Sequence, residues 1–325
     1  MRWLAGSALG IAVAAGMATP GAAQVKSNLI LGATASTSSH YAASIGMAKA
    51  IKETYPAVSV TVLETGASVD NIRRMTRNEV DFGLVGSDVA VLAINGQGQF
   101  EGRAVPDLVA LYAYDNAALN IAVRADSGVN SLADLSGKKF NPGNRGSAAE
   151  SLTRQSFDLL NIKPDWSPGS LKDAVEGVQN RQLVGYSKYG VGTTLDATLR
   201  ELMVSTNMKV LGYTAAQEKL VLSNIKGIVF VTLPENLLPN NPAVRVPAIQ
   251  GLFMARQSGM NDDTAFAIAR SIYEKQQYII EAFPHLKDKF DFKVEALRTE
   301  GIGIKLHPGA KKFWESLPAT TKSSS

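Results

Sequence analysis

Apolar residues follow two alternating spacings along the first hundred residues of the chain. Short apolar runs have the length and composition of buried strands, and a segment with helical spacing follows each of them. The predicted strands are residues 27–33, 58–63 and 80–85. The helices predicted after them are residues 40–54, 69–77 and 88–94. Alternation of strands and helices is typical of a mostly parallel sheet, so the pattern predicts an α/β fold.

Helical spacing also predicts which side of the first helix is buried, namely the side that carries Tyr41, Ile45, Ala48 and Ile51. Ser68 and Ser87 directly precede the next two predicted helices. A hydroxyl at this position commonly accepts a hydrogen bond from the first turn, so both serines are expected to act as helix caps.

The same alternation resumes in the second half of the chain. Strands are predicted at residues 108–114, 120–124, 139–140, 183–186 and 209–213. Helices are predicted at residues 147–160, 170–180, 194–203, 262–283 and 310–317. The sequence thus predicts two α/β units in series, followed by a helical C-terminal part.

The N-terminus has the pattern of an export signal. Arg2 precedes an apolar run over residues 4–17, and small residues follow up to Ala23. The alternative is a membrane anchor, but the run is shorter than the roughly 20 apolar residues that a span needs. We expect residues 1–23 to be a signal peptide that is cleaved, which would leave a periplasmic protein.

Composition excludes several classes of function. The 33 Lys and Arg residues are nearly balanced by 29 Asp and Glu residues and are scattered, so no nucleic-acid partner is expected. The chain has no cysteine, which excludes disulfides and thiol chemistry. His40, His285 and His307 lack the spacing of metal ligands, and surface positions or local hydrogen bonds are expected for them. With no nucleophile elbow and no dinucleotide fingerprint, we expect no catalytic residue, cofactor or metal.

Polar loops follow several predicted strands, where ligands bind in open α/β sheets. The loop at 141–147 could form an anion cradle from backbone N–H groups, with a bidentate contact from Arg145. An ordinary capped turn with a solvated arginine is the alternative. The candidate residues in this loop are Asn141, Gly143, Asn144, Arg145, Gly146 and Ser147.

Further candidates lie in the other loops and at strand ends. They are Thr34, Ser36, Thr37, Ser38, Ser39, Ser68, Ser87, Tyr112 and Lys188. Each hydroxyl could contact a ligand or merely cap a helix, and Tyr112 could wall a cleft or lie in the core. Lys188 could be a cation in the cleft or a solvated charge.

Six segments, in this order and spacing, resemble the TAXI family, the solute receptors of tripartite ATP-independent periplasmic (TRAP) transporters. They are Leu31–Tyr41, Glu64–Arg73, Glu79–Val89, Val123–Lys138, Val246–Leu252 and Leu306–Ala310. The resemblance implies a type II periplasmic binding protein fold, in which two lobes joined by crossover strands close on a ligand. It places lobe I at residues 25–117 plus 250–325 and lobe II at 118–249.

The resemblance also implies a small organic anion as ligand, TRAP permease subunits as partners and a monomer. It adds Tyr41 and Thr65 to the candidate binding residues. Two departures from the family concern charge. Ala148 and Ala149 follow Gly146-Ser147 where the family often has Gly-Thr, and Lys188 ends a segment where the family commonly has apolar residues. If Arg145 and Lys188 both point inward, the two cations favour a ligand with a second carboxylate.

Other functions stay open on the sequence. A receptor of an ATP-driven (ABC) importer has the same fold, and a sensor component would present bound ligand to a membrane kinase. A secreted hydrolase or isomerase on a two-lobed scaffold would need a nucleophile or a base with a shifted pKa in the cleft.

Overall fold

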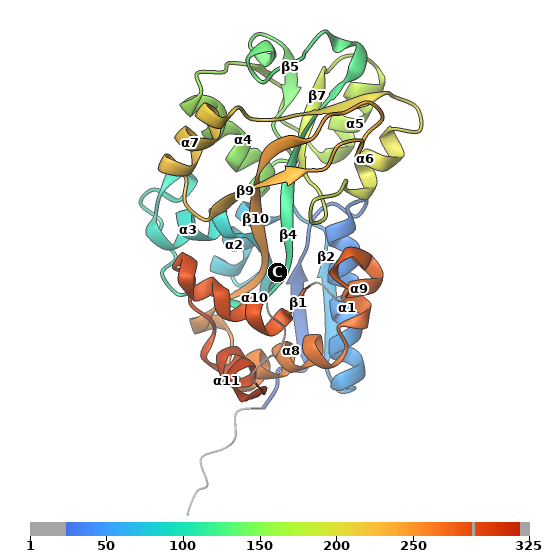
Figure 1. Cartoon of the computed structure of the whole chain (residues 1–325). Coiled ribbons are helices and arrows are strands. Elements are labelled where there is room, and N and C mark those ends of the chain that lie inside the picture. The colour runs from blue at the N-terminus through green and yellow to red at the C-terminus, as the bar shows by residue number, and fades with distance from the viewer. Residues whose placement is uncertain (1–23, 288–289, 319–325) are drawn as a thin grey trace, which may run out of the picture.

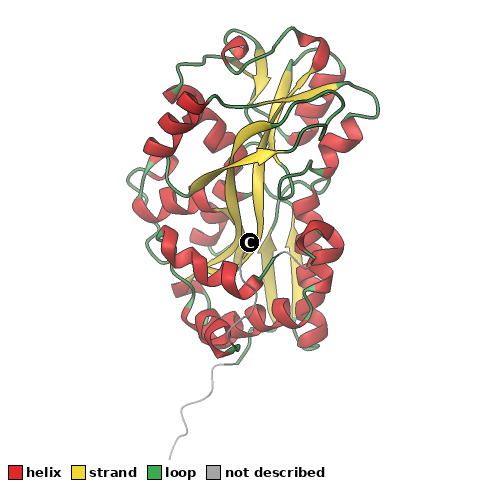
Figure 2. Cartoon of the chain, in the orientation of Figure 1, coloured by secondary structure: helices red, strands yellow, loops and turns green. Residues whose placement is uncertain are grey.

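The computed structural model describes residues 24–287 and 290–318. The expected signal peptide lies outside the described residues. The described chain forms two lobes, one above the other in Figure 1, with a sheet running through both. Helices flank the strands on both sides in each lobe (Figure 2). Among the described residues, no helix combines the length and the apolar character that a membrane crossing requires.

Lobe I is built on the predicted parallel strands. These are β1 (Asn28–Gly32), β2 (Ser59–Leu63) and β3 (Phe82–Gly86), with β1 in the centre. The helices that follow them are α1 (Ser39–Thr54), α2 (Ser68–Thr76) and α3 (Ser87–Asn95). The predicted strand and helix order of this part of the chain is confirmed, with boundaries that differ by a few residues.

Two long antiparallel strands join the lobes: β4 (Leu108–Arg124) and β10 (Val244–Arg256). The sequence prediction of two separate strands at 108–114 and 120–124 was wrong. Asp115 interrupts the apolar run, but its carboxylate is fully buried and accepts hydrogen bonds from His285 and the N–H group of Gly192. The polar residues therefore mark the crossing between the lobes and do not end the strand.

Lobe II holds the remaining strands. They are β5 (Lys139–Asn141), β6 (Asp165–Trp166), β7 (Gly185–Tyr189), β8 (Met208–Leu211) and β9 (Ile228–Leu233). Its helices are α4 (Ala148–Leu159), α5 (Leu171–Gln179), α6 (Ala197–Leu202) and α7 (Ala215–Asn224). The strands β5, β6 and β7 are parallel, as in lobe I, and β4 pairs antiparallel with β7 and β8. The sequence pattern did not predict α7, β9 or β10.

The C-terminal helices return to lobe I. They are α8 (Asp262–Glu274), α9 (Gln277–Ala282), α10 (Phe292–Arg298) and α11 (Pro308–Ser316). The predicted single helix at 262–283 is divided between α8 and α9, and Ala265, Ile268, Ile272 and Ile279, which share one face at helical spacing, are all buried. Since α8 and α9 pack against α1, the C-terminal helices lie in lobe I together with the N-terminal part of the chain, as Figure 1 shows. This arrangement supports the lobe boundaries 25–117 plus 250–325 and 118–249, which we propose.

The buried side of α1 differs in part from the prediction. Ile51 is buried as predicted, but Ala43, Met47 and Ala50 are fully buried as well, whereas Ile45 is 47% exposed. A Cβ atom at Gly46 would lie 2.4 Å from the carbonyl oxygen of Tyr278, so α9 approaches the α1 backbone closely. Small residues permit this approach, and an apolar-periodicity argument underestimates alanine and glycine as contact residues.

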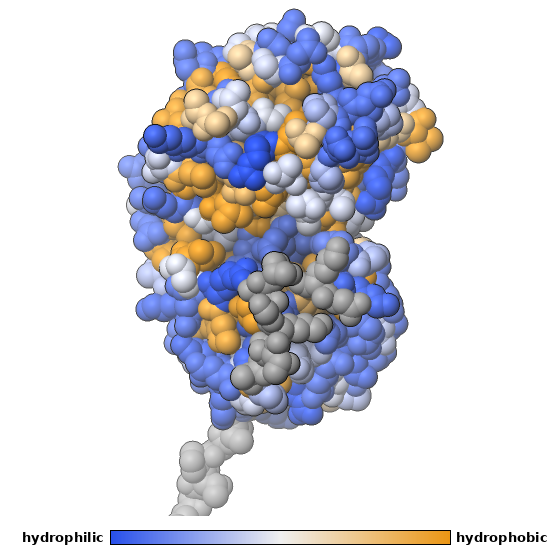
Figure 3. Space-filling view, in the orientation of Figure 1, coloured by the Kyte–Doolittle hydropathy of each residue, from blue (hydrophilic) through white to orange (hydrophobic). Residues whose placement is uncertain are grey.

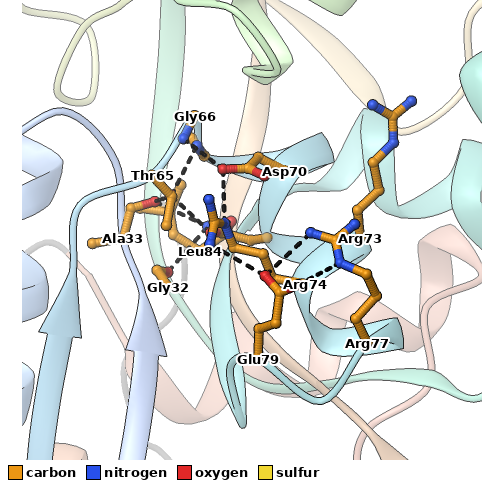
Figure 4. Close-up of polar contacts among 12 residues, drawn as sticks. Gly32, Ala33, Thr65, Gly66, Asp70, Arg73, Arg74, Arg77, Glu79 and Leu84 are labelled. Atoms are coloured by element: carbon orange, nitrogen blue, oxygen red, sulfur yellow. Dashed lines mark hydrogen bonds and ion pairs between the residues drawn. The ribbon is translucent and has the colours of Figure 1, made fainter.

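Asn71 on α2 holds the ends of β1 and β3 together beside the interlobe space. Its Nδ2 atom donates to the carbonyl oxygens of Gly32, Ala33 and Leu84 at 2.8–3.0 Å. Thr65 donates to its Oδ1 atom at 2.7 Å, so the amide is saturated. Figure 4 shows these contacts next to a separate ion-pair group of Arg74, Arg77 and Glu79 on the outer side of α2. Asn71 therefore fixes the loops from which the site is built.

Replacing Asn71 by alanine should destabilise the protein by at least about 2 kcal/mol, because it leaves buried carbonyl groups without a donor. Asn95→Ala is the matched control, since the Asn95 amide also donates to a carbonyl group but is exposed. Urea unfolding of both variants decides this prediction. An equal decrease in the free energy of unfolding of the two variants would mean that the Asn71 hydrogen bonds do not hold the strand ends together.

Candidate functional site

A small cavity of about 50 Å³ lies between the lobes. Its wall is mostly apolar and combines residues of both lobes. The residues that line it are Thr34, His40, Ala67, Ser68, Leu84, Val85, Gly86, Tyr114, Ala117, Asn144, Ser147, Ala148, Ala149, Leu171, Lys188, Tyr189, Ile249 and Gly251. A water molecule needs roughly 10–15 Å³ by the same measure, so the closed cavity has room for a small molecule only.

The N-termini of five helices converge on this cavity. α1 contributes His40, α2 contributes Ser68, and the residue before α3 is Gly86. Ala148 and Ala149 are the first two residues of α4, and Leu171 is the first residue of α5. Each helix N-terminus carries unpaired N–H groups and roughly half a positive charge, so the wall favours a negative ligand group.

Among the described residues that line the cavity, Lys188 on β7 is the one formally charged side chain. It is only 8% exposed, and its Nζ atom donates to the Ser38 hydroxyl at 3.0 Å. The carboxylate of Asp196 lies 3.7 Å from Nζ. The sequence left open whether Lys188 is solvated, and the structure places it inside the cleft with a counter-charge behind it.

His40 joins the two lobes at the cavity wall. Its Nε2 atom lies 3.0 Å from the carbonyl oxygen of Gly190, which can only accept, so Nε2 carries the proton. Nδ1 then accepts from the Tyr114 hydroxyl at 2.8 Å. Burial lowers the pKa of His40, and the charge on Lys188 lowers it further. The expectation of a surface position for His40 was therefore wrong, and its neutral ring leaves the Tyr114 oxygen as an acceptor for ligand.

The hydroxyl-rich loop before α1 is divided among three environments. Thr34 lines the cavity, whereas Ser36 and Thr37 line an open outer groove of about 970 Å³. Ser38 and Ser39 bond to the start of α6: Ser39 N donates to Asp196 at 3.0 Å, and Ser39 Oγ accepts from Ala197 N at 3.0 Å. Tyr41 lines neither space.

The backbone of the 141–147 turn is largely engaged within the protein. Gly143 N donates to Asn141 Oδ1 and Gly146 N donates to Glu150, both at 2.8 Å. The N–H groups of Arg145 and Ser147 donate to the carbonyl oxygens of Gly169 and Asn144. The free donors near the cavity are instead those of the first turn of α4, which have no intrahelical partners.

The side chains of this turn are divided between the cavity and the outer groove. Asn144 and Ser147 line the cavity, and Ser147 caps α4 as predicted. The Arg145 side chain is exposed and lines the outer groove. The two cations, Arg145 and Lys188, therefore face different spaces in the closed protein.

Ser68 and Ser87 do not cap their helices, and those predictions were wrong. Ser68 lines the cavity and accepts from Gly86 N at 3.0 Å. Ser87 donates to the carbonyl oxygen of Gly227 at 2.6 Å and accepts from Gln250 N at 3.0 Å. Both hydroxyls link segments that are distant in the sequence. The local sequence cannot distinguish this role from helix capping.

Thr65 and Tyr112 lie next to the site but do not line the cavity. Thr65 borders the outer groove and donates to Asn71 and to the carbonyl oxygen of Ala33. Tyr112 is buried in the core and stacked on Phe253 at 5.2 Å between ring centroids. Tyr114, two residues further along β4, is the tyrosine of this strand that reaches the cavity.

Two buried acidic residues near the cavity were not anticipated. Asp196 is described below with its partners. Asp88, in the first turn of α3, is 1% exposed, and neither carboxylate oxygen has a hydrogen-bond partner among the described residues. Burial raises its pKa to about 7. No group of three His, Asp or Glu side chains suited to a metal occurs within the part of the chain that the structure describes.

Comparisons with known proteins agree with this architecture. The sequence profile of the NMT1-like family matches residues 31–316. A protein from Bordetella bronchiseptica RB50 has a similar structure, with a TM-score of 0.54 and 15% identity over 89% of this chain and 98% of that chain. This likeness shows the fold, and the expected two-lobed periplasmic binding protein fold is confirmed.

Two further structures are similar at lower scores. The alkanesulfonate-binding protein SsuA from Xanthomonas axonopodis pv. citri, bound to MOPS, has a TM-score of 0.48 and 15% identity over 91% of this chain and 86% of that chain. A TRAP periplasmic solute-binding protein from Roseobacter denitrificans OCh 114, with bound L-galactonate, has a TM-score of 0.49 and 12% identity over 89% of this chain and 94% of that chain.

The raised pKa of Asp88 makes stability depend on pH. An unfolded aspartate titrates near 3.9, so between about pH 4 and pH 7 only the folded state holds this proton, and stability falls as pH rises. The free energy of unfolding of Asp88→Asn should equal that of wild type near pH 4 and should be higher than that of wild type at pH 8. Urea unfolding at the two pH values measures the difference.

Asp134→Asn is a control for which the expected change in stability at pH 8 has the opposite sign. The N–H groups of Asn130 and Ser131 lower the pKa of Asp134, so its contribution is present above about pH 4 and is lost as pH falls. This variant should be less stable than wild type at pH 8. If Asp88→Asn is also less stable than wild type at pH 8, Asp88 is ionised and paired in the folded protein.

Proposed function

The chain belongs to the NMT1-like family, and from this premise we propose that it is a periplasmic solute-binding protein that captures a small organic anion between its lobes. The observation that carries the proposal is the convergence of five helix N-termini and the buried Lys188 on one small cavity between the lobes. In a wall of low polarity, these fixed positive groups interact with an anion more strongly than they would in water.

The ligand carboxylate fits best between Lys188 and the first turn of α4. The N–H groups of Ala148 and Ala149 are unpaired within the helix, and the Ser147 hydroxyl lies beside them, although it already accepts from Glu150. A lysine ammonium has three donors, and Ser38 takes one of them. Six of the other wall residues are alanine, leucine, valine or isoleucine and two are tyrosines, so the body of the ligand is apolar.

Hydrogen bonds between the two lobes support the proposal that the lobes close around the ligand. Val69 N of lobe I donates to the carbonyl oxygen of Gly146 at 2.8 Å, on one side of the cavity. His40, Ser39 and their partners in lobe II bridge the other side. Figure 3 shows the molecule narrowing between the lobes, where a hinge motion would open the cavity.

Binding without catalysis is the simpler account of these residues. Both ring nitrogens of His40 are engaged in hydrogen bonds, so it is not poised as a base. A secreted hydrolase or isomerase is the rival of a different class. Turnover of any carboxylate that binds would favour that rival.

We assign the TRAP system as the transport partner on the resemblance to the TAXI family, with delivery to TRAP permease subunits by a monomer. An ABC importer is the alternative, and a sensor component would differ only in its partner. A neighbouring gene for a large fused permease would favour TRAP, and one for an ATPase would favour ABC. N-terminal sequencing of periplasmic protein should begin near Gln24 if residues 1–23 are the cleaved signal.

A panel of small carboxylates should raise the melting temperature of the wild-type protein. Ligand at a hundredfold excess over its Kd stabilises the folded state by about 2.7 kcal/mol. Calorimetric titration of the best compound should show at least ~tenfold weaker binding by Lys188→Gln, because a hydrogen bond to a charged group contributes about 1.5–3 kcal/mol.

Arg145→Gln is the matched control, because it removes the same charge from the exposed outer groove. Its affinity should stay within about threefold of wild type, since solvent screens an exposed charge. Stabilisation by cations or neutral sugars alone would overturn the organic-anion assignment. A larger loss in Arg145→Gln than in Lys188→Gln would move the site to the outer groove.

A further inference from the structure

The carboxylate of Asp196 lies at the N-terminus of α1, where a bound anion would be expected. Its Oδ2 atom accepts from the backbone N–H group of Ser39 at 3.0 Å and from the Ser38 hydroxyl at 3.2 Å. Its Oδ1 atom accepts from Thr198 N at 3.0 Å, and Lys188 Nζ lies 3.7 Å away. The side chain is 1% exposed, so this carboxylate is enclosed by protein donors.

These donors come from both lobes. Ser38 and Ser39 belong to lobe I, whereas Lys188 and Asp196 belong to lobe II, 150 or more residues further along the chain. Burial alone would raise the pKa of Asp196, but the charge on Lys188 and the N–H groups of Thr198 and Ser39 outweigh it, and the pKa is lowered. The group is therefore an anion held between the lobes.

We propose that Asp196 is a built-in carboxylate that occupies the anion position at the N-terminus of α1. It thereby determines where a ligand anion binds in the cavity and which anions can bind. With the Ser38 and Ser39 donors occupied, the ligand carboxylate is directed to the other side of Lys188, toward α4. The anion position itself follows from the geometry of Asp196. The consequence for selectivity rests on the proposed function.

Charge balance in the cavity gives the selectivity. Lys188 is the one cation in the wall, and Asp196 already offsets its charge. The helix N-termini can stabilise one more negative group, but a second carboxylate would be buried without a partner, which is costly. The ligand is therefore a monoanion with an apolar body, and not a dicarboxylate that uses both Arg145 and Lys188.

Removing the Asp196 carboxylate should create a site for a free anion. Serine caps helices nearly as well as aspartate and is smaller, so Asp196→Ser keeps the start of α6 and vacates the position. Sodium formate should then raise the melting temperature of Asp196→Ser in a saturable way, at ionic strength matched with sodium chloride. Asp196→Asn fills the same position with an uncharged amide and should show no such response to formate.

Wild type and Asp126→Ser serve as references for general salt effects, because Asp126 is an exposed acid of lobe II that is paired with Arg181. A response of Asp196→Ser no larger than that of Asp126→Ser would overturn the proposal. An Asp196→Ser variant that stays unfolded even with formate would contradict it as well. Folding that depends on formate would support it.

The selectivity is tested separately with matched acids of four carbons, butyrate and succinate, by thermal shift on wild type and Asp196→Asn. Wild type should prefer butyrate, and the preference should move at least ~tenfold toward succinate in Asp196→Asn, where Lys188 has lost its counter-charge. If Asp196→Asn keeps the same preference for butyrate as wild type, the proposed selectivity is wrong. If no carboxylate binds to wild type but formate stabilises Asp196→Ser, the proposed function is refuted and the anion position is not.

Discussion

The convergence of helix N-termini on one enclosed space is the constraint on which the site depends. In each lobe, parallel strands end at the same edge of the sheet, and the next helix begins there. β4 and β10 cross between the lobes and set these two edges against each other. The N-terminal ends of α1, α2, α3, α4 and α5 thus meet around one largely apolar wall.

Such a concentration of positive dipoles needs negative charge, and the protein supplies part of it. Asp196 satisfies the first turn of α1 and offsets Lys188. Asp88 lies in the first turn of α3, but burial without hydrogen-bond partners among the described residues raises its pKa to about 7. The first turn of α4 has no such acid facing the cavity, because Glu150 turns back to Gly146 N and Arg154. In α2 and α5, Val69 N donates to the carbonyl oxygen of Gly146 and Leu171 N donates to Asn144 Oδ1, so α4 is the position that we propose for a ligand.

Much of the fold could be predicted from local pattern, because strand and helix signals in lobe I repeat with clear spacing. The crossing strands could not, since Asp115 resembles a loop residue until its partners His285 and Gly192 are known. In the site, the sequence indicated the right loops but not the role of each hydroxyl. Ser38 and Ser39 find their partner 157 or more residues away, and no local rule separates that contact from capping or ligand binding.

The most direct test of the account is a crystal structure with the carboxylate that raises the melting temperature most. The account predicts that the ligand lies inside the interlobe cavity, with its carboxylate between Lys188 and the first turn of α4. Asp196 should keep its contacts with Ser38 and Ser39 in that complex. A ligand bound only in the outer groove beside Arg145 would contradict the account.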